Sequence, residues 1–192
     1  MKRRQSGLNL VELMVALVVA GIALSIGVPS FNVSIKNSRL TTAVNNLVTS
    51  MHIARSEATK RGTPVTLCRT DQTAIATPVC GSGSNWRDGW MVFVDTNNNA
   101  TLDSAAGEDV LHVTGAQHEK LNVISDNVIN QAITYRANGF ANLAPGGSGP
   151  RYLVFCDDSK ADRFSRVLAI SNTGRPQIIP PLSPLHTRPS CE

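Results

Sequence analysis

An almost unbroken apolar run dominates the first 35 positions of the chain. Between Leu13 and Val28 the one polar side chain is Ser25, and no charged residue occurs between Leu13 and Ile35. As a single helix, residues 8–35 would be roughly 40 Å long, enough to cross the hydrocarbon core of a bilayer. The pattern predicts a membrane-inserted helix over residues 8–30.

The pattern becomes amphipathic after Pro29. Apolar or small residues recur at alternating spacings of four and three, which marks one face of a helix over residues 31–62. They are Leu40, Val44, Leu47, Met51, Ala54 and Ala58. Lys60 and Arg61 suit the negative end of the helix dipole, and Gly62 suits the position just beyond the helix. We expect Pro29 to bend or locally unwind the helix, and Met51 to be a core residue.

Short apolar segments separated by turn-rich pieces follow residue 63. The strand candidates are residues 65–68, 90–95, 110–113, 121–125, 132–136, 152–156, 167–171 and 177–179. The sequence contains no second long helical pattern and no internal repeat. We therefore predict an α+β fold, in which a long N-terminal helix packs on an antiparallel β-sheet domain at residues 63–192.

Composition and charge narrow the class of protein. The chain has 192 residues, 42% of them hydrophobic and 17% charged, which argues against disorder. Its formal net charge is +4, but Lys2, Arg3 and Arg4 stand together ahead of the apolar run. Without these three the chain has 15 basic and 14 acidic residues, so its overall charge is weak evidence for a polyanion partner. The same cluster places the N-terminus in the cytoplasm.

The four cysteines form no C-x-x-C pair, and the four histidines do not stand at zinc-ligand spacing beside them. An even number of cysteines behind a membrane-targeting N-terminus indicates two disulfides in an oxidising compartment. Three pairings exist, and we favour the local one, Cys68–Cys80 with Cys156–Cys191. The alternative is a cytosolic protein with four free thiols.

Glu12 argues against two simpler interpretations of the N-terminal segment, an ordinary signal peptide and a plain membrane anchor. An unpaired carboxylate inside an apolar run costs several kcal/mol in hydrocarbon, and neither of those alternatives gains from it. The helical pattern also continues past Pro29, whereas a discarded segment should end at a break. Glu12 therefore needs a partner.

Gly7 and the following residues, Leu8 to Glu12, resemble the type III signal of type IV prepilins and type II secretion pseudopilins. The resemblance implies that prepilin peptidase removes the leader, residues 1–7, by cutting after Gly7, and that Leu8 is then N-methylated. The family usually has phenylalanine where this sequence has Leu8, and commonly has a proline at the position of Pro29. One subunit's Glu12 would neutralise the freed N-terminus of a neighbouring subunit and so fix their register.

Four later motifs resemble the minor pilins and pseudopilins of the GspH/FimT type: ARSEA at 54–58, GTPVTLC at 62–68, GWMVFVD at 89–95 and SNTGR at 171–175. This resemblance implies a low-abundance structural subunit near the filament tip that helps to start assembly. Its partners would be other pilins or pseudopilins. It would lie in the bacterial inner membrane with its C-terminal domain in the periplasm. A pilus and a type II secretion system remain equal alternatives.

DNA is a further candidate partner. In the DNA-uptake minor pilins of this group, a Gly-Arg-x-Arg turn contacts phosphates. Gly174 and Arg175 match that turn, but Gln177 replaces its second arginine. Affinity for phosphates grows with the number of cations engaged, so a solvated turn arginine is the alternative interpretation.

A calcium loop is a weak hypothesis. Acidic and polar residues alternate as in an EF-hand loop, at Asp95, Asn97, Asn99, Thr101 and Asp103. Ala100 and Ala106 replace the required glycine and glutamate, and Glu108 comes two residues late. The alternative is a turn whose side chains cap backbone amides. The sequence predicts no metal, no cofactor and no enzyme activity, because it contains no nucleophile elbow, phosphate loop or H-E-x-x-H motif.

Overall fold

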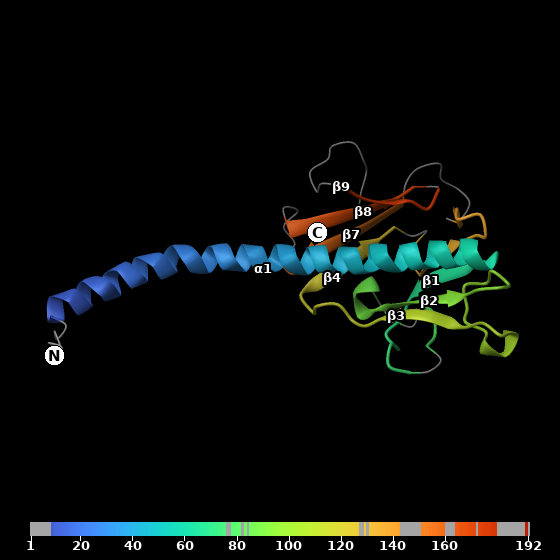
Figure 1. Cartoon of the computed structure of the whole chain (residues 1–192), viewed down its shortest axis with the longest axis horizontal. Coiled ribbons are helices and arrows are strands. Elements are labelled where there is room, and N and C mark those ends of the chain that lie inside the picture. The colour runs from blue at the N-terminus through green and yellow to red at the C-terminus, as the bar shows by residue number, and fades with distance from the viewer. Residues whose placement is uncertain are drawn as a thin grey trace, which may run out of the picture. The chain divides into compact units, whose positions relative to one another are not determined.

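The structure is a computed structural model. It describes residues 9–75, 78–81, 83, 85–126, 129, 131–142, 151–159, 164–171, 173–179 and 191, without the side chains of residues 26 and 28–30. The chain divides into two compact units, Met1–Ser38 and Arg39–Glu192. One helix, α1 (Leu10–Arg61), contributes to both units, and all the strands follow it (Figure 1).

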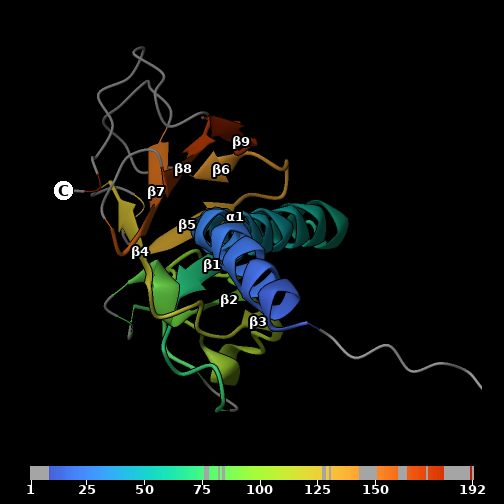
Figure 2. The same ribbon diagram turned by 90° about the vertical axis from the view of Figure 1, so that its left-hand side faces the viewer.

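The second unit contains two antiparallel sheets (Figure 2). The first has the strand order β3-β2-β1-β5-β6 and the second has the order β4-β7-β8-β9. The strands are β1 (Val65–Arg69), β2 (Trp90–Val94), β3 (Val110–Thr114), β4 (Leu121–Ser125), β5 (Ala132–Tyr135), β6 (Ala141–Asn142), β7 (Arg151–Asp157), β8 (Ser165–Ile170) and β9 (Pro176–Ile179). The predicted α+β fold is confirmed. The strands form two sheets and not one, because β4 pairs with β7 and not with its sequence neighbour β5.

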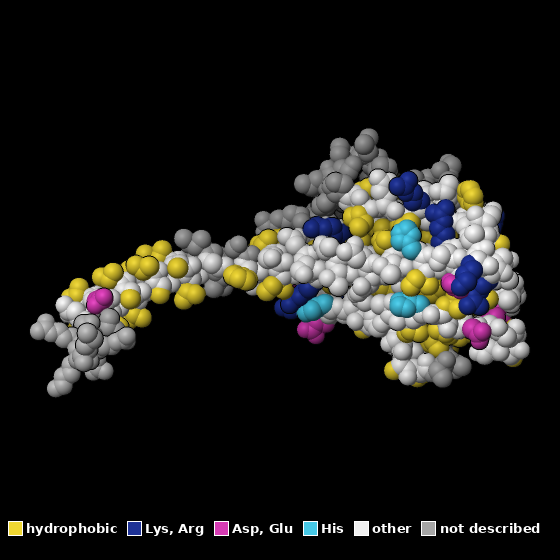
Figure 3. All heavy atoms as spheres, viewed as in Figure 1, with side chains coloured by type: hydrophobic (Ala, Val, Ile, Leu, Met, Phe, Trp, Pro, Cys, Tyr) yellow, Lys and Arg dark blue, Asp and Glu magenta, His cyan; other side chains and the backbone are white. Residues whose placement is uncertain are grey.

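The first unit exposes apolar side chains around much of the helix surface. Ten large hydrophobic residues between Leu10 and Leu24 are each at least 51% exposed. Figure 3 shows hydrophobic side chains along the visible face of this part of α1. The Ser25 hydroxyl donates to the carbonyl oxygen of Ile22 at 2.8 Å, so its polarity is satisfied within the helix.

Two further observations concern this first part of α1. Within the described residues, no helix combines the length and the apolar character that a membrane span requires. The helix runs through Pro29 without interruption, so local unwinding is not observed there, and the bend stays a prediction.

In the second unit, α1 buries the face that its sequence pattern marks. Every residue of the predicted stripe is at most 1% exposed, namely Leu40, Val44, Leu47, Met51, Ala54 and Ala58. Met51 is therefore a core residue, as predicted. The helix ends where expected, because Gly62 has a φ of 68° and donates its N–H to the carbonyl oxygen of Ala58 at 3.0 Å.

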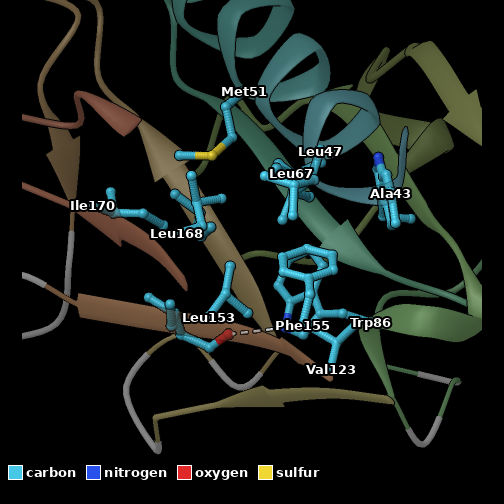
Figure 4. Packing of buried hydrophobic residues seen from close by; sticks show 14 of the residues in the cluster. Ala43, Leu47, Met51, Leu67, Trp86, Val123, Leu153, Phe155, Leu168 and Ile170 are labelled. Carbon is cyan, nitrogen blue, oxygen red and sulfur yellow. Dashed lines mark hydrogen bonds between the residues drawn. The ribbon is translucent and has the colours of Figure 1, made fainter. Parts of the chain in front are cut away.

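The buried face of α1 packs on residues from both sheets to form one core. Figure 4 shows Leu47 and Met51 of α1 lying over Leu67 of the first sheet and Leu168 of the second. The two buried indoles have polar partners: Trp86 Nε1 donates to the carbonyl oxygen of Ile129 at 3.2 Å, and Trp90 Nε1 donates to Ser50 Oγ at 2.8 Å.

Both disulfides are present in the structure. Cys68 of β1 is joined to Cys80, and Cys156 of β7 is joined to Cys191 near the C-terminus. These are the local pairs that the sequence favours. The second bridge attaches the end of the chain to the second sheet.

Candidate functional site

The processing and assembly residues lie only partly within the described chain. Gly7 and Leu8 lie outside the described residues. Glu12 lies in the first turn of α1 with an exposed side chain, among apolar neighbours. No other described residue forms an ion pair with it.

The second candidate site is the turn between β8 and β9. The N–H of Gly174 donates to the carbonyl oxygen of Ser171 at 2.8 Å, and the N–H of Arg175 donates to Ser171 Oγ at 3.1 Å. Gly174 has a φ of 76° and is buried, whereas Arg175 is exposed. The turn therefore fixes the backbone and leaves the arginine side chain in solvent.

Tyr135 of β5 anchors this turn through a hydrogen bond. Its hydroxyl donates to the carbonyl oxygen of Gly174 at 2.8 Å. A Cβ at position 174 would lie 2.6 Å from Tyr135 Cε1 and 2.9 Å from the backbone nitrogen of Ala141. The turn thus requires glycine both for its left-handed backbone and for this close approach. The glycine of the Gly-Arg pair has a structural reason that is independent of any ligand.

Arg55 of α1 belongs to the same neighbourhood, which the sequence did not indicate. Burial raises the pKa of the Tyr135 phenol, and the positive charge of Arg55 opposes that shift. A Cβ on Gly139, in the turn between β5 and β6, would lie 3.4 Å from Arg55 Nε. Arg55 is half-buried, not a freely solvated helix residue.

Within the part of the chain that the structure describes, the surroundings of the Gly174 turn include one further arginine. Gln177, which replaces the second arginine of the DNA-contacting motif, is exposed on β9. Arg136 follows β5 and donates from its guanidinium to Asn142 Oδ1 of β6 at 2.7 Å. Arg175 and Arg136 are both exposed, and Arg136 lies beside β6 through its bond to Asn142.

The calcium candidates form a turn whose side chains accept backbone amides. Asp95 is fully buried and accepts the N–H groups of Asn99 and Ala100 at 3.0 and 3.1 Å. Asp103 Oδ2 accepts the side-chain amides of Asn97 and Asn99, each at 2.9 Å, and these bonds hold the pKa of Asp103 below its usual value.

Glu108 completes the turn, because it accepts the N–H groups of Thr96 and Asp103, each at 2.8 Å. Among the described residues, no group of three or more acidic, histidine or cysteine side chains is placed to hold a metal ion. The geometry is that of the capped turn, the alternative to a calcium loop.

Three comparisons relate the chain to known proteins. A search of curated proteins finds no match. Two crystal forms of the type IV minor pilin FimU from Pseudomonas aeruginosa are similar, each with 21% sequence identity. Their TM-scores are 0.57 and 0.55, and the alignments cover 81% and 80% of this chain and 96% and 100% of FimU. The likeness shows that the two proteins share a fold.

A protein-family comparison gives the assignment. The family described as type II transport protein GspH matches residues 43–174. The match extends from the buried half of α1 to the Gly174 turn and includes most of the strands. The chain is therefore a member of the GspH family and has the fold of a type IV minor pilin.

Proposed function

We propose that this protein is a minor type IV pilin, a structural subunit that helps to start the filament and lies near its tip. It is made in the inner membrane as a single-pass precursor with a cytoplasmic N-terminus and a periplasmic C-terminal domain. Prepilin peptidase cuts after Gly7, and Leu8 is then methylated. The protein acts by assembly with other pilins and not by catalysis.

The observation that carries this proposal is the exposed apolar surface of α1 between Leu10 and Leu24. Fully burying a large apolar side chain stabilises by about 1.5–3 kcal/mol, so covering ten that are 51–72% exposed is worth on the order of 10–20 kcal/mol. A helix with that much exposed apolar surface requires lipid or other apolar helices around it. A filament subunit has both, before and after assembly.

Glu12 gives the assembled helices a defined register. Its carboxylate is costly in an apolar surrounding unless a cation pairs with it. A cut after Gly7 creates an ammonium group at Leu8, and the ammonium of a neighbouring subunit would be that cation. The pair forms only between subunits at one axial offset. The charge of Glu12 therefore selects one register of neighbouring helices.

The test is the substitution Glu12→Val in the full chain in its host. The variant should be cut and inserted normally, because the cleavage site is intact, but its incorporation into filaments should fall at least tenfold. Met14→Val, an apolar exchange on the same helix, serves as the matched control. Normal incorporation of the Glu12→Val variant would show that assembly does not require Glu12, and it would refute the proposal.

A minor pseudopilin of a type II secretion system is the structural alternative, and the description of the matching family favours it. Both functions use the same N-terminal chemistry, so the discriminating observation is the filament itself. Deletion of the chain should abolish surface pili if the proposal is right. Loss of protein secretion with intact pili would support the pseudopilin.

DNA binding is a second candidate function, favoured by the exposed Arg175 on a rigid turn. A fragment of residues 31–192 should retard duplex DNA at low salt, and Arg175→Gln should weaken that retardation. The control is Lys120→Gln, which removes an exposed cation that is distant from Arg175 in the sequence. Absence of any retardation at low salt would exclude this candidate.

A further inference from the structure

The turn between β5 and β6 contains the one Asn-Gly pair of the chain, Asn138 and Gly139. Asn138 is exposed, whereas Gly139 is buried and has a φ of 77°. A Cβ at position 139 would lie 3.2 Å from Thr59 Oγ1 and 3.4 Å from Arg55 Nε, both on α1. The backbone and the packing of this turn therefore favour glycine directly after an exposed asparagine.

The side chain of Asn138 is folded back over the backbone that follows it. Its Oδ1 accepts the N–H of Phe140, two residues ahead, at 3.1 Å. The ring that this bond closes includes the backbone nitrogen of Gly139, so Asn138 Cγ and that nitrogen are held in one compact turn. The same bond draws electron density away from Cγ, which makes this carbon a better target for a nucleophile.

The backbone nitrogen of a glycine is an unshielded nucleophile. In any other residue the Cβ hinders the approach of the backbone nitrogen to the preceding side chain and restricts φ. Asn142 of β6 gives the comparison within the same hairpin, because Leu143 follows it and its Oδ1 accepts the Arg136 guanidinium at 2.7 Å. We therefore expect Asn138 to react faster than Asn142.

One hydrogen bond opposes the reaction at Asn138. The N–H of Gly139 donates to the carbonyl oxygen of Arg136 at 2.8 Å, so the nitrogen is free to attack only while this bond is open. The hairpin around it is short, because β6 has two residues and pairs with β5 at two positions. Short pairings of this kind open locally more readily than core strands do. The fold therefore slows the attack relative to an unfolded chain but does not prevent it.

We propose that Asn138 is a site of spontaneous deamidation. The Gly139 nitrogen loses its proton to hydroxide and attacks Asn138 Cγ, where a new C–N bond forms. The bond from Cγ to the side-chain nitrogen breaks, and this nitrogen takes up a proton from water and leaves as ammonia. Water then opens the resulting succinimide at one of its two carbonyl carbons and gives aspartate or isoaspartate at position 138. The net reaction consumes one water and needs no oxidant, metal or cofactor.

Either product places a negative charge in a neighbourhood of cations. Arg55 lies against Gly139, the next residue, and Arg136 stands two residues earlier. Isoaspartate also lengthens the main chain of the turn by one methylene group, which disturbs the short pairing of β6 with β5. Because Ala141 of β6 packs against Gly174, the disturbance reaches the β8–β9 turn. Deamidation thus changes both the charge and the packing of this surface.

The test incubates the full chain, purified in detergent, at mildly alkaline pH, where more of the Gly139 nitrogen is deprotonated. Trypsin releases residues 137–151 as one peptide, which contains both Asn138 and Asn142. Fragmentation of this peptide in a mass spectrometer should place the exchange of the amide NH2 for OH at position 138. The exchange should be at least about tenfold faster there than at Asn142. A methyltransferase specific for isoaspartate should label the same peptide.

Asn138→Gln should abolish both signals, because the longer glutamine side chain closes a ring on the next backbone nitrogen far more slowly. Asn142→Gln is the matched control and should leave the conversion at position 138 unchanged. A sample digested without incubation gives the background of the digestion itself. Conversion at position 138 that does not exceed this background, that is no faster than at Asn142, or that leaves the methyl label intact in Asn138→Gln would overturn the inference.

Discussion

Replacing Gly174 by alanine tests the packing that holds the β8–β9 turn. Gly174 has a φ of 76°, and an added Cβ would lie 2.6 Å from Tyr135 Cε1, 2.9 Å from the nitrogen of Ala141 and 3.0 Å from its Cβ. Two of these neighbours belong to β6, which is paired with β5, and Tyr135 is fully buried. None of them can move aside without disturbing the core.

Two separate costs contribute to the expected loss of stability. A left-handed backbone costs a residue with a Cβ about 1–2 kcal/mol. Inserting a methyl group into a packed site typically adds about 1–3 kcal/mol. The free energy of unfolding of Gly174→Ala should therefore fall by roughly 2–5 kcal/mol.

Gly62→Ala is the matched control, because Gly62 has a φ of 68° but nothing within 4 Å of its added Cβ. It should lose the backbone term alone, about 1–2 kcal/mol. Urea denaturation of a fragment of residues 31–192 measures both values. If the two substitutions cost the same, the close packing of Gly174 on Tyr135 is wrong.

Three further predictions use the same fragment. Because burial raises the pKa of Tyr135, its neutral form contributes stability that is complete below about pH 10 and is lost as the pH rises further. Tyr135→Phe should therefore flatten the fall in stability above pH 10, while costing about 1 kcal/mol at neutral pH for the hydrogen bond to Gly174. Removing the Cys156–Cys191 disulfide, which has a sequence separation of 35, should cost about 4 kcal/mol in urea denaturation, against about 3 kcal/mol for the shorter bridge of separation 12. The reverse order would contradict the loop-length argument. Calorimetry should detect no heat on addition of calcium, and a saturable heat would contradict the capped-turn geometry of residues 95–108.

The local elements of the fold could be predicted from the sequence because their signals are local. The alternating spacing of four and three residues marks the buried face of α1, and Gly62 marks its end. Most strands were found because apolar segments stand between turn-rich ones. β6 was missed because it has two residues, and its pairing with β5 defines it more than its own pattern does.

The arrangement of these elements could not be predicted in the same way. The division into two sheets depends on the pairing of β4 with β7, which are separated by the whole of β5 and β6. Likewise Arg55, Tyr135 and Gly174 come together through packing over more than one hundred positions of the chain. The Gly-Arg pair was visible in the sequence, but the reason for its glycine was not.

The mass of the mature protein, purified from its native host, tests the central claim most directly. The account predicts a chain that begins at Leu8 and carries one added methyl group, and predicts that Gly7→Val leaves the precursor uncut. A protein that retains residues 1–7, or one that is cut beyond residue 20, would contradict the assignment as a filament subunit.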